Sequence, residues 1–144
     1  GRWGWQSREF LNQYEPHPYF SRVHFPGYIE NADLPALYQM ASLFVYPSSY
    51  EGFGLPVLEA MASGLTVITT KVSSMPEFVG TAGMMVEPNN SELLKAAMKT
   101  LLADKPERDR LGALAKLIAQ EYTWKKTAEK TISAYKKVLS GRGD

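Results

Sequence analysis

The chain has 144 residues, a length that fits one domain able to bury a core without a disulfide or a metal. Its 16 basic and 15 acidic side chains leave a net charge of +1, which excludes a broad electrostatic attraction for nucleic acid. Cysteine is absent, and the two histidines have no acidic or thiol companion at ligand spacing, so we expect neither thiol catalysis nor a metal site.

The first part of the chain predicts little regular structure. It opens with Gly1-Arg2-Trp3-Gly4-Trp5, without an initiator methionine or a signal peptide, so we expect a piece of a longer protein. A short helix is expected over residues 6–14, ended by the turn-forming sequence of residues 15–18. The run Val23–Phe25 is expected to be a weak strand, because Pro26-Gly27 stops it.

From residue 31 onward, short apolar strands alternate with helices. Strands are expected over 43–46, 66–70 and 84–86, and helices over about 34–41, 56–63, 92–103, 106–122 and 124–139. Asn89-Asn90-Ser91 and Thr123 have the composition of N-caps, and Gly64 suits the position after a helix end. This alternation predicts a Rossmann-like α/β fold, with a parallel sheet and helices on both of its faces.

One loop has the features of a binding site. Glu51-Gly52-Phe53-Gly54 lies between the strand at 43–46 and the helix that Pro56 begins. Ligands of open α/β sheets bind at the carboxyl ends of the strands, where this loop is expected. Gly52 and Gly54 permit positive φ and close approach of a ligand. The amides from Leu55 to Val57, in the first helical turn, are expected to lack intrahelical partners and to bind an anion such as a diphosphate.

Two glutamates flank these amides. Glu59 and Ser63 are the polar residues of an otherwise apolar helix, and a carboxylate at position 59 suits a ribose diol. Glu51, before the glycines, is placed to reach the part of a ligand beyond the diphosphate. Taken singly, each feature has a simpler interpretation. Glu-Gly-Phe-Gly is also a tight-turn sequence, and Glu59 would stabilise a helix dipole by about 0.3–1 kcal/mol.

The segment from Glu51 to Ala62 resembles the E-x7-E signature of retaining glycosyltransferases of family 4, which have the GT-B fold. Residues 25–29 resemble that family's F-x-G-x-V strand end, and residues 33–41 its D-L-x-x-L-Y-x-x-A helix. Pro76-Glu77, residues 83–86 and residues 122–124 also follow in family order. The resemblance runs from about Phe25 to Leu139.

The resemblance implies a role for each residue of the site. Glu51 would be the catalytic residue beside the anomeric carbon of the sugar, either as a stabiliser of positive charge or as a nucleophile. Glu59 would bind the ribose, and Tyr28 and Ile29 would meet the nucleobase. The residues expected to hold the sugar hydroxyls and the diphosphate through their backbone are Gly52, Phe53, Gly54, Leu55, Pro56 and Val57. No metal and no cofactor are implied. The substrate would be a nucleotide sugar such as UDP-glucose or GDP-mannose.

The resemblance also implies missing parts. Residues 1–140 would be a partial donor-binding domain without its first β-α-β unit, followed by a disordered tail at 141–144. The acceptor domain would be absent, so we expect no activity from this chain alone. The missing strands would leave a sheet edge unpaired, and this edge or the last helix, from Trp124, is a candidate contact for a homo-oligomer.

Other functions stay open at this point. We expect a cytoplasmic protein, with membrane-peripheral attachment of a full-length enzyme as an open alternative. A non-catalytic binding or assembly module and a nucleotide-sugar 2-epimerase are alternatives to a transferase. A dinucleotide-binding dehydrogenase is disfavoured, because no G-x-G-x-x-G follows any strand.

Overall fold

Short apolar strands, each followed by a helix, build the larger of two compact units. The computed structural model describes residues 7–141, and the chain divides into a first unit that ends at Leu34 and a second that begins at Pro35. The first unit contains the helix α1 (Ser7–Tyr14) and the short 3-10 helix η1 (Phe20–Arg22). Residues 1–6 and 142–144, which include the expected start of the first helix and most of the expected tail, lie outside the described residues.

The prediction of a strand over Val23–Phe25 is wrong. Val23 has extended backbone angles, with φ −92° and ψ 121°, but the run forms no ladder. The side chains of Val23 and Phe25 are 50% and 42% exposed. A strand requires a neighbour to pair with, and the described sheet consists of segments from the second unit.

The second unit has a parallel sheet in the order β1-β2-β3. From residue 34 onward, the elements in chain order are α2 (Leu34–Met40), β1 (Phe44–Tyr46), α3 (Leu55–Ala62), β2 (Val67–Thr70), α4 (Met75–Val79), β3 (Gly83–Val86), α5 (Ser91–Ala103), α6 (Lys105–Ala119) and α7 (Trp124–Ser140). The parallel α/β fold expected from the alternation is therefore confirmed. The five-residue helix α4 was not expected from the sequence, and β1 is half-buried rather than buried. Both β1 and β3 are edges of the described sheet.

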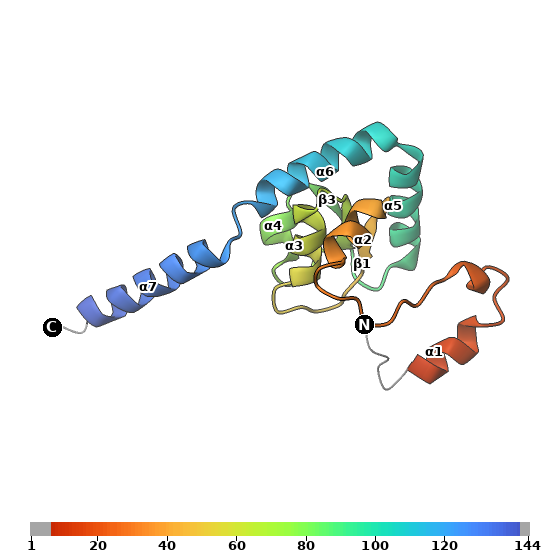
Figure 1. Ribbon diagram of the computed structural model, residues 1–144, viewed down its shortest axis with the longest axis horizontal. Helices are drawn as coiled ribbons and strands as arrows, with labels where there is room; N and C mark the ends of the chain where they lie inside the picture. Colours follow the sequence, from red (N-terminus) through yellow and green to blue (C-terminus); the bar gives the residue numbers. More distant parts are fainter. Residues whose placement is uncertain (1–6, 142–144) are drawn as a thin grey trace. The chain divides into compact units, whose positions relative to one another are not determined.

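The two faces of the sheet carry separate apolar cores. Successive side chains of a strand point to opposite faces. Val67 accordingly packs in the cluster that α3, α4 and α6 cover, whereas Ile68 packs with Leu101 of α5 and Leu111 of α6. Figure 1 shows α3 and α4 on one side of the strands and α5 on the other. Helices therefore cover both faces, and the carboxyl ends of the strands stay available to loops.

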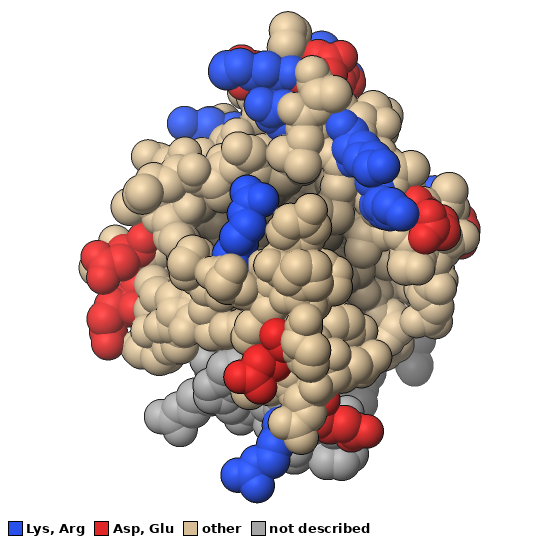
Figure 2. Space-filling view, turned by 90° about the vertical axis from the view of Figure 1, so that its right-hand side faces the viewer, with Lys and Arg blue, Asp and Glu red and all other residues tan. Residues whose placement is uncertain are grey.

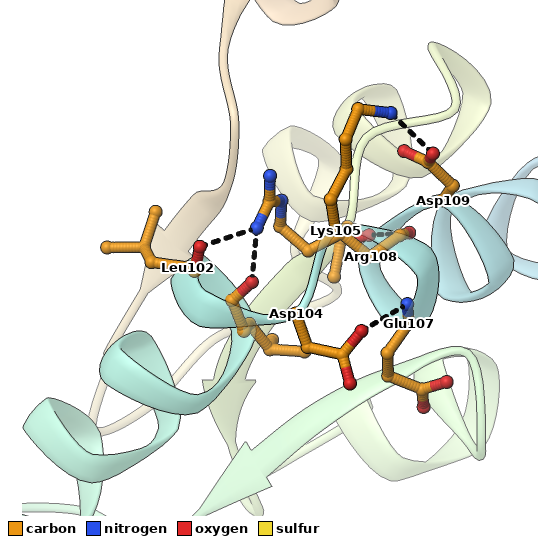
Figure 3. A network of polar contacts seen from close by, with 8 residues as sticks. Leu102, Asp104, Lys105, Glu107, Arg108 and Asp109 are labelled. Atoms are coloured by element: carbon orange, nitrogen blue, oxygen red, sulfur yellow. Dashed lines mark hydrogen bonds and ion pairs between the residues drawn. The ribbon is translucent and has the colours of Figure 1, made fainter.

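Polar contacts fix the sharp corner between α5 and α6 (Figure 3). Asp104 is the single residue between the two helices, and its carboxylate accepts a hydrogen bond from the N–H of Glu107 at 2.9 Å. The guanidinium of Arg108 donates to the carbonyl oxygens of Leu101 at 2.5 Å and Leu102 at 2.8 Å. One helix start and one helix end are thus satisfied within a few residues.

The last helix buries none of its side chains in the described structure. Thr123 begins it as an N-cap, accepting a hydrogen bond from the N–H of Lys126 at 3.2 Å. The large apolar side chains of this helix that are exposed are Trp124, Ile132, Tyr135, Val138 and Leu139. Among residues 7–141, no helix combines the length and the apolar character that spanning a bilayer requires.

Candidate functional site

The loop between β1 and α3 lies at the carboxyl edge of the sheet and is anchored from β2 and the segment that follows it. The buried Thr70, the last residue of β2, donates its hydroxyl to the carbonyl oxygen of Ser48. The N–H of Glu51 donates to the hydroxyl of Ser73 at 3.2 Å, and Ser74 donates to the carbonyl of Phe53 at 2.7 Å. These contacts hold both halves of the loop by its backbone.

Gly54 sets the path of the chain from the loop into α3. It is the N-cap of α3 and has φ 91° and ψ 47°, the left-handed region that favours glycine. A Cβ at this position would lie 2.2 Å from the terminal methyl carbon of Met75. Gly52 differs from the expectation, since its φ is not positive and a Cβ built on it would meet nothing within 4 Å.

The loop also presents backbone donors, and they are only part of the expected set. The N–H of Val57 donates to the carbonyl of Gly54 at 3.0 Å, and Pro56 has no N–H, so these two positions offer no free donor. Within residues 7–141, the N–H groups of residues 52–55 donate to no other group. The unengaged amides therefore run from the glycine loop to Leu55, the first residue of α3, because the N–H of Val57 bonds back to Gly54.

Glu51 is held by hydroxyl groups. The phenol of Tyr46 donates to its Oε1 at 2.7 Å, and the hydroxyl of Ser48, which also lies 2.9 Å from the carbonyl of Tyr50, is 2.9 Å from the same oxygen. Glu51 itself is half-buried and forms no ion pair with any described residue. The hydrogen bond to Glu51, with burial adding to it, raises the pKa of Tyr46.

Glu59 lies on the exposed stripe of α3, eight positions after Glu51. Its Oε2 accepts a hydrogen bond from the phenol of Tyr38 on α2 at 3.2 Å, and it too forms no ion pair within residues 7–141. Burial, followed by the negative charge of Glu59, raises the pKa of Tyr38 to about 12. Val57, Ala60 and Met61 cover the buried side of the helix, which leaves Glu59 facing outward.

The remaining expected residues are distributed as follows. The ring of Phe53 stacks on Phe78 at 5.1 Å and lies 6.1 Å from Tyr122, so its side chain packs against the fold rather than standing free. Leu55 is 48% exposed. Tyr28 and Ile29 belong to the first unit, and their role at the nucleobase stays a prediction.

Tyr38, Tyr46, Ser48 and Ser73 are the residues that sequence reasoning missed. Tyr46 and Ser48 stand five and three positions before Glu51, at the end of a strand, so their nearness was readable from the sequence. Tyr38 was recognised only as a helix residue, because its partner Glu59 is 21 positions away.

Two cavities lie at opposite edges of the sheet. A cavity of about 310 Å³ lies at the carboxyl edge and is lined in part by Pro47, Thr70 and Asn90. A cavity of about 350 Å³ lies at the amino ends of the strands, beside Tyr38 and Arg108. Glu51 and Glu59 line neither of these two cavities. On the face in Figure 2, basic and acidic side chains are interspersed, without a continuous basic region.

Metal ligands do not gather in the part of the chain that the structure describes. No group of three or more His, Cys, Asp or Glu side chains among residues 7–141 is arranged to hold an ion. The groups that the loop and its neighbours do present are backbone donors, two carboxylates and the hydroxyl groups bonded to these carboxylates.

A parallel sheet with helices on both faces and a glycine loop at its carboxyl edge defines the class of open α/β folds. The chain belongs to the family described as glycosyl transferases group 1, which it matches over residues 7–118. It is 42% identical over 114 residues to O-antigen chain mannosyltransferase B of Escherichia coli, covering 79% of this chain and 30% of that protein. It is 34% identical over 122 residues to the MMP alpha-(1->4)-mannosyltransferase of Mycolicibacterium hassiacum, covering 82% of this chain and 30% of that protein.

Solved structures agree with this assignment. Sucrose-phosphate synthase from Thermosynechococcus elongatus superposes with a TM-score of 0.86 at 29% identity, over 96% of this chain and 35% of that one. Anabaena Alr3699/HepE in complex with UDP-glucose superposes with a TM-score of 0.80 at 26% identity, over 96% of this chain and 38% of that one. The chain thus spans about a third of the length of these four proteins.

Proposed function

We propose that this chain is the donor-binding part of a retaining hexosyltransferase of family 4, which takes its hexose from a nucleotide-diphosphate sugar. The observation that carries the proposal is the run of unengaged N–H groups at residues 52–55, between Glu51 and Glu59. Such a run, at the start of a helix, binds oxyanions without a basic side chain. Because the net charge of the chain is only +1, we expect a phosphate group to be bound by local backbone donors rather than by a broad basic surface.

The charges of the site match the charges of the proposed reaction. Breaking the bond between sugar and diphosphate builds positive charge on the sugar and negative charge on the leaving group. Backbone donors at residues 52–55 would stabilise the leaving group, and the carboxylate of Glu51 would stabilise the sugar cation. We assign Glu51 a stabilising role rather than a nucleophilic one. Glu59, outward-facing on α3, would hold the ribose diol, and Tyr28 and Ile29 would contact the base.

The relatives indicate which donor to test first. Two of the similar proteins are named mannosyltransferases, so GDP-mannose is the first candidate. Alr3699/HepE was solved with UDP-glucose, which makes this compound the second. The chain by itself is expected to bind its donor without transferring the sugar, since it spans about a third of these proteins.

Isothermal titration calorimetry of the 144-residue chain tests the proposal. We expect binding of GDP-mannose or UDP-glucose, weakened at least about tenfold by Glu59→Ala, because the ribose loses its acceptor for two hydroxyl groups. Glu129→Ala, on the exposed face of α7, is the matched control and should bind like the wild type. Absence of binding to any nucleotide or nucleotide sugar would refute the donor site.

One observation favours a second candidate function, an assembly module. The exposed apolar side chains of α7, including Ile132 and Leu139, form a stripe at helical spacing. A second copy of the chain, offering the same stripe, would cover it. Sedimentation velocity across a concentration series should then show self-association that Ile132→Glu abolishes, and a wild-type chain that stays monomeric throughout would exclude this candidate.

A further inference from the structure

A row of three aromatic rings connects the two glutamates of the loop. Tyr38 of α2 meets Phe44 of β1 edge-on, with ring centroids 5.5 Å apart. Phe44 stacks on Tyr46 at 5.8 Å, with the ring planes 14° apart. Phe44 and Tyr46 are two positions apart on one strand, so they share a face of the sheet. The rings therefore pack as one unit, with a phenol at each end.

Each phenol is bonded to one motif glutamate. Tyr46 donates to Glu51, and Tyr38, at the other end of the row, donates to Glu59. The rings that carry these hydroxyl groups pack against Phe44, so the hydroxyl groups have few alternative positions. A glutamate that accepts from such a hydroxyl loses rotamer freedom before any ligand arrives.

The bonds are selective for one oxygen of each carboxylate. The hydroxyl groups of Tyr46 and Ser48 both lie within hydrogen-bond distance of Oε1 of Glu51. Within residues 7–141, Oε2 of Glu51 has no hydrogen-bond donor. Tyr38 donates to Oε2 of Glu59. Among the same residues, Oε1 of Glu59 has no donor. One carboxylate oxygen of each glutamate is therefore available to a ligand, and the hydrogen bond to the other oxygen restricts the direction in which it points.

We infer that Tyr38 and Tyr46 are positioning residues of the donor site, each orienting one glutamate so that its second oxygen meets the ligand. Tyr46, together with Ser48, aims Glu51 at the sugar, and Tyr38 aims Glu59 at the ribose. This inference rests on the proposed function, because that function assigns sugar and ribose to the two acids. It goes beyond that function by assigning roles to residues outside the motif.

The two tyrosines act on the glutamates as hydrogen-bond donors. Burial and the charge of Glu59 raise the pKa of Tyr38 to about 12, and the bond to Glu51 raises the pKa of Tyr46. Both phenols therefore remain protonated donors near neutral pH. A hydroxyl that stays protonated supplies a fixed dipole, which is the property that positioning needs.

The test compares ligands that contain or lack the ribose and the sugar, because Tyr38 is assigned to the ribose and Tyr46 to the sugar. Tyr38→Phe and Tyr46→Phe each remove one hydroxyl and keep the ring. Calorimetry of the 144-residue chain would compare GDP-mannose, GDP and inorganic pyrophosphate, or UDP-glucose and UDP if the wild type binds only uridine compounds. Tyr38→Phe should weaken the nucleotide and the nucleotide sugar about three- to tenfold and leave pyrophosphate unchanged. Tyr46→Phe should weaken the nucleotide sugar by a similar factor and leave the nucleotide unchanged.

Two controls separate positioning from folding. Tyr135→Phe removes a phenol that is 67% exposed on α7, and it should bind all ligands like the wild type. Ser48→Ala removes the second hydroxyl at Oε1 of Glu51, so it should reproduce the effect of Tyr46→Phe on the nucleotide sugar even if Tyr46→Phe unfolds. Urea unfolding of every variant shows whether the fold is intact.

The possible outcomes are distinguishable. If the wild type binds its nucleotide sugar, Glu59→Ala loses it, and both phenylalanine variants bind like the wild type, the positioning roles are wrong and the proposed function stands. A uniform loss of affinity for all ligands, pyrophosphate included, would show that the ring row merely supports the fold. A wild type that binds no nucleotide refutes the proposed function and this inference with it.

Discussion

Gly54 is the position where the geometry of the loop makes the sharpest prediction. Its backbone has φ 91° and ψ 47°, which costs a residue with a Cβ about 1–2 kcal/mol. The added Cβ of Gly54→Ala would also lie 2.2 Å from the terminal methyl carbon of Met75 and 3.0 Å from its sulfur. Met75 is fully buried, so its methyl group can move only by displacing its neighbours.

The two costs can be added because they arise from different causes. Overpacking of a well-filled core costs about 1–3 kcal/mol, and we take the lower part of that range because methionine is flexible. Gly54→Ala should therefore lower the free energy of unfolding by about 2–4 kcal/mol, a large share of the stability of a small domain. The loop carries the proposed donor site, so nucleotide binding should be lost as well.

Urea denaturation followed by circular dichroism measures the change, with Gly52→Ala as the matched control. A Cβ at Gly52 meets nothing within 4 Å, and its φ is not positive, so we expect a change below about 1 kcal/mol. Gly54→Asn separates the two causes, because asparagine tolerates the left-handed region but still carries the Cβ. Equal stability of Gly54→Ala and the wild type would refute the geometry of this turn.

Two further predictions concern ionisation and helix capping. The pKa of Tyr38 is raised to about 12, so the stability that its neutral phenol contributes is complete below pH 10 and is lost as the pH rises through about 12. Glu59→Gln should move this pKa down without restoring its ordinary value, since burial remains. Ultraviolet difference titration against Tyr38→Phe measures it, and ionisation of Tyr38 near pH 10 in the wild type would contradict us. Asp104→Ala should lower the free energy of unfolding by about 1 kcal/mol, because the start of α6 loses its cap. Its control Asp109→Ala, which removes an exposed ion pair with Lys105, should cost less than about 0.5 kcal/mol in the same urea experiment, and equal costs would show that Asp104 is no cap.

Helix ends were predictable because their hydrogen bonds join close neighbours in sequence. Asn90 accepts from the N–H of Leu93 at 3.0 Å, and Thr123 begins α7, both as expected. Gly64 has φ 79° just after α3, where it permits the next N–H, of Leu65, to bond back to the carbonyl of Ala60 at 3.0 Å. Strand and helix alternation likewise predicted the parallel sheet, since burial on both faces demands continuous apolar strands.

The amino-acid sequence by itself thus determined the elements, their order and the place of the glycine loop, because each of these depends on local propensity and periodicity. Only the tertiary structure decided which groups of that loop are free. The N–H of Val57 is engaged by the carbonyl of Gly54, and the free donors lie at residues 52–55. The hydroxyl partner of Glu59 comes from Tyr38 on α2, 21 positions away in the sequence. Val23–Phe25 is no strand, although its composition suits one, because a strand exists only where another chain segment pairs with it.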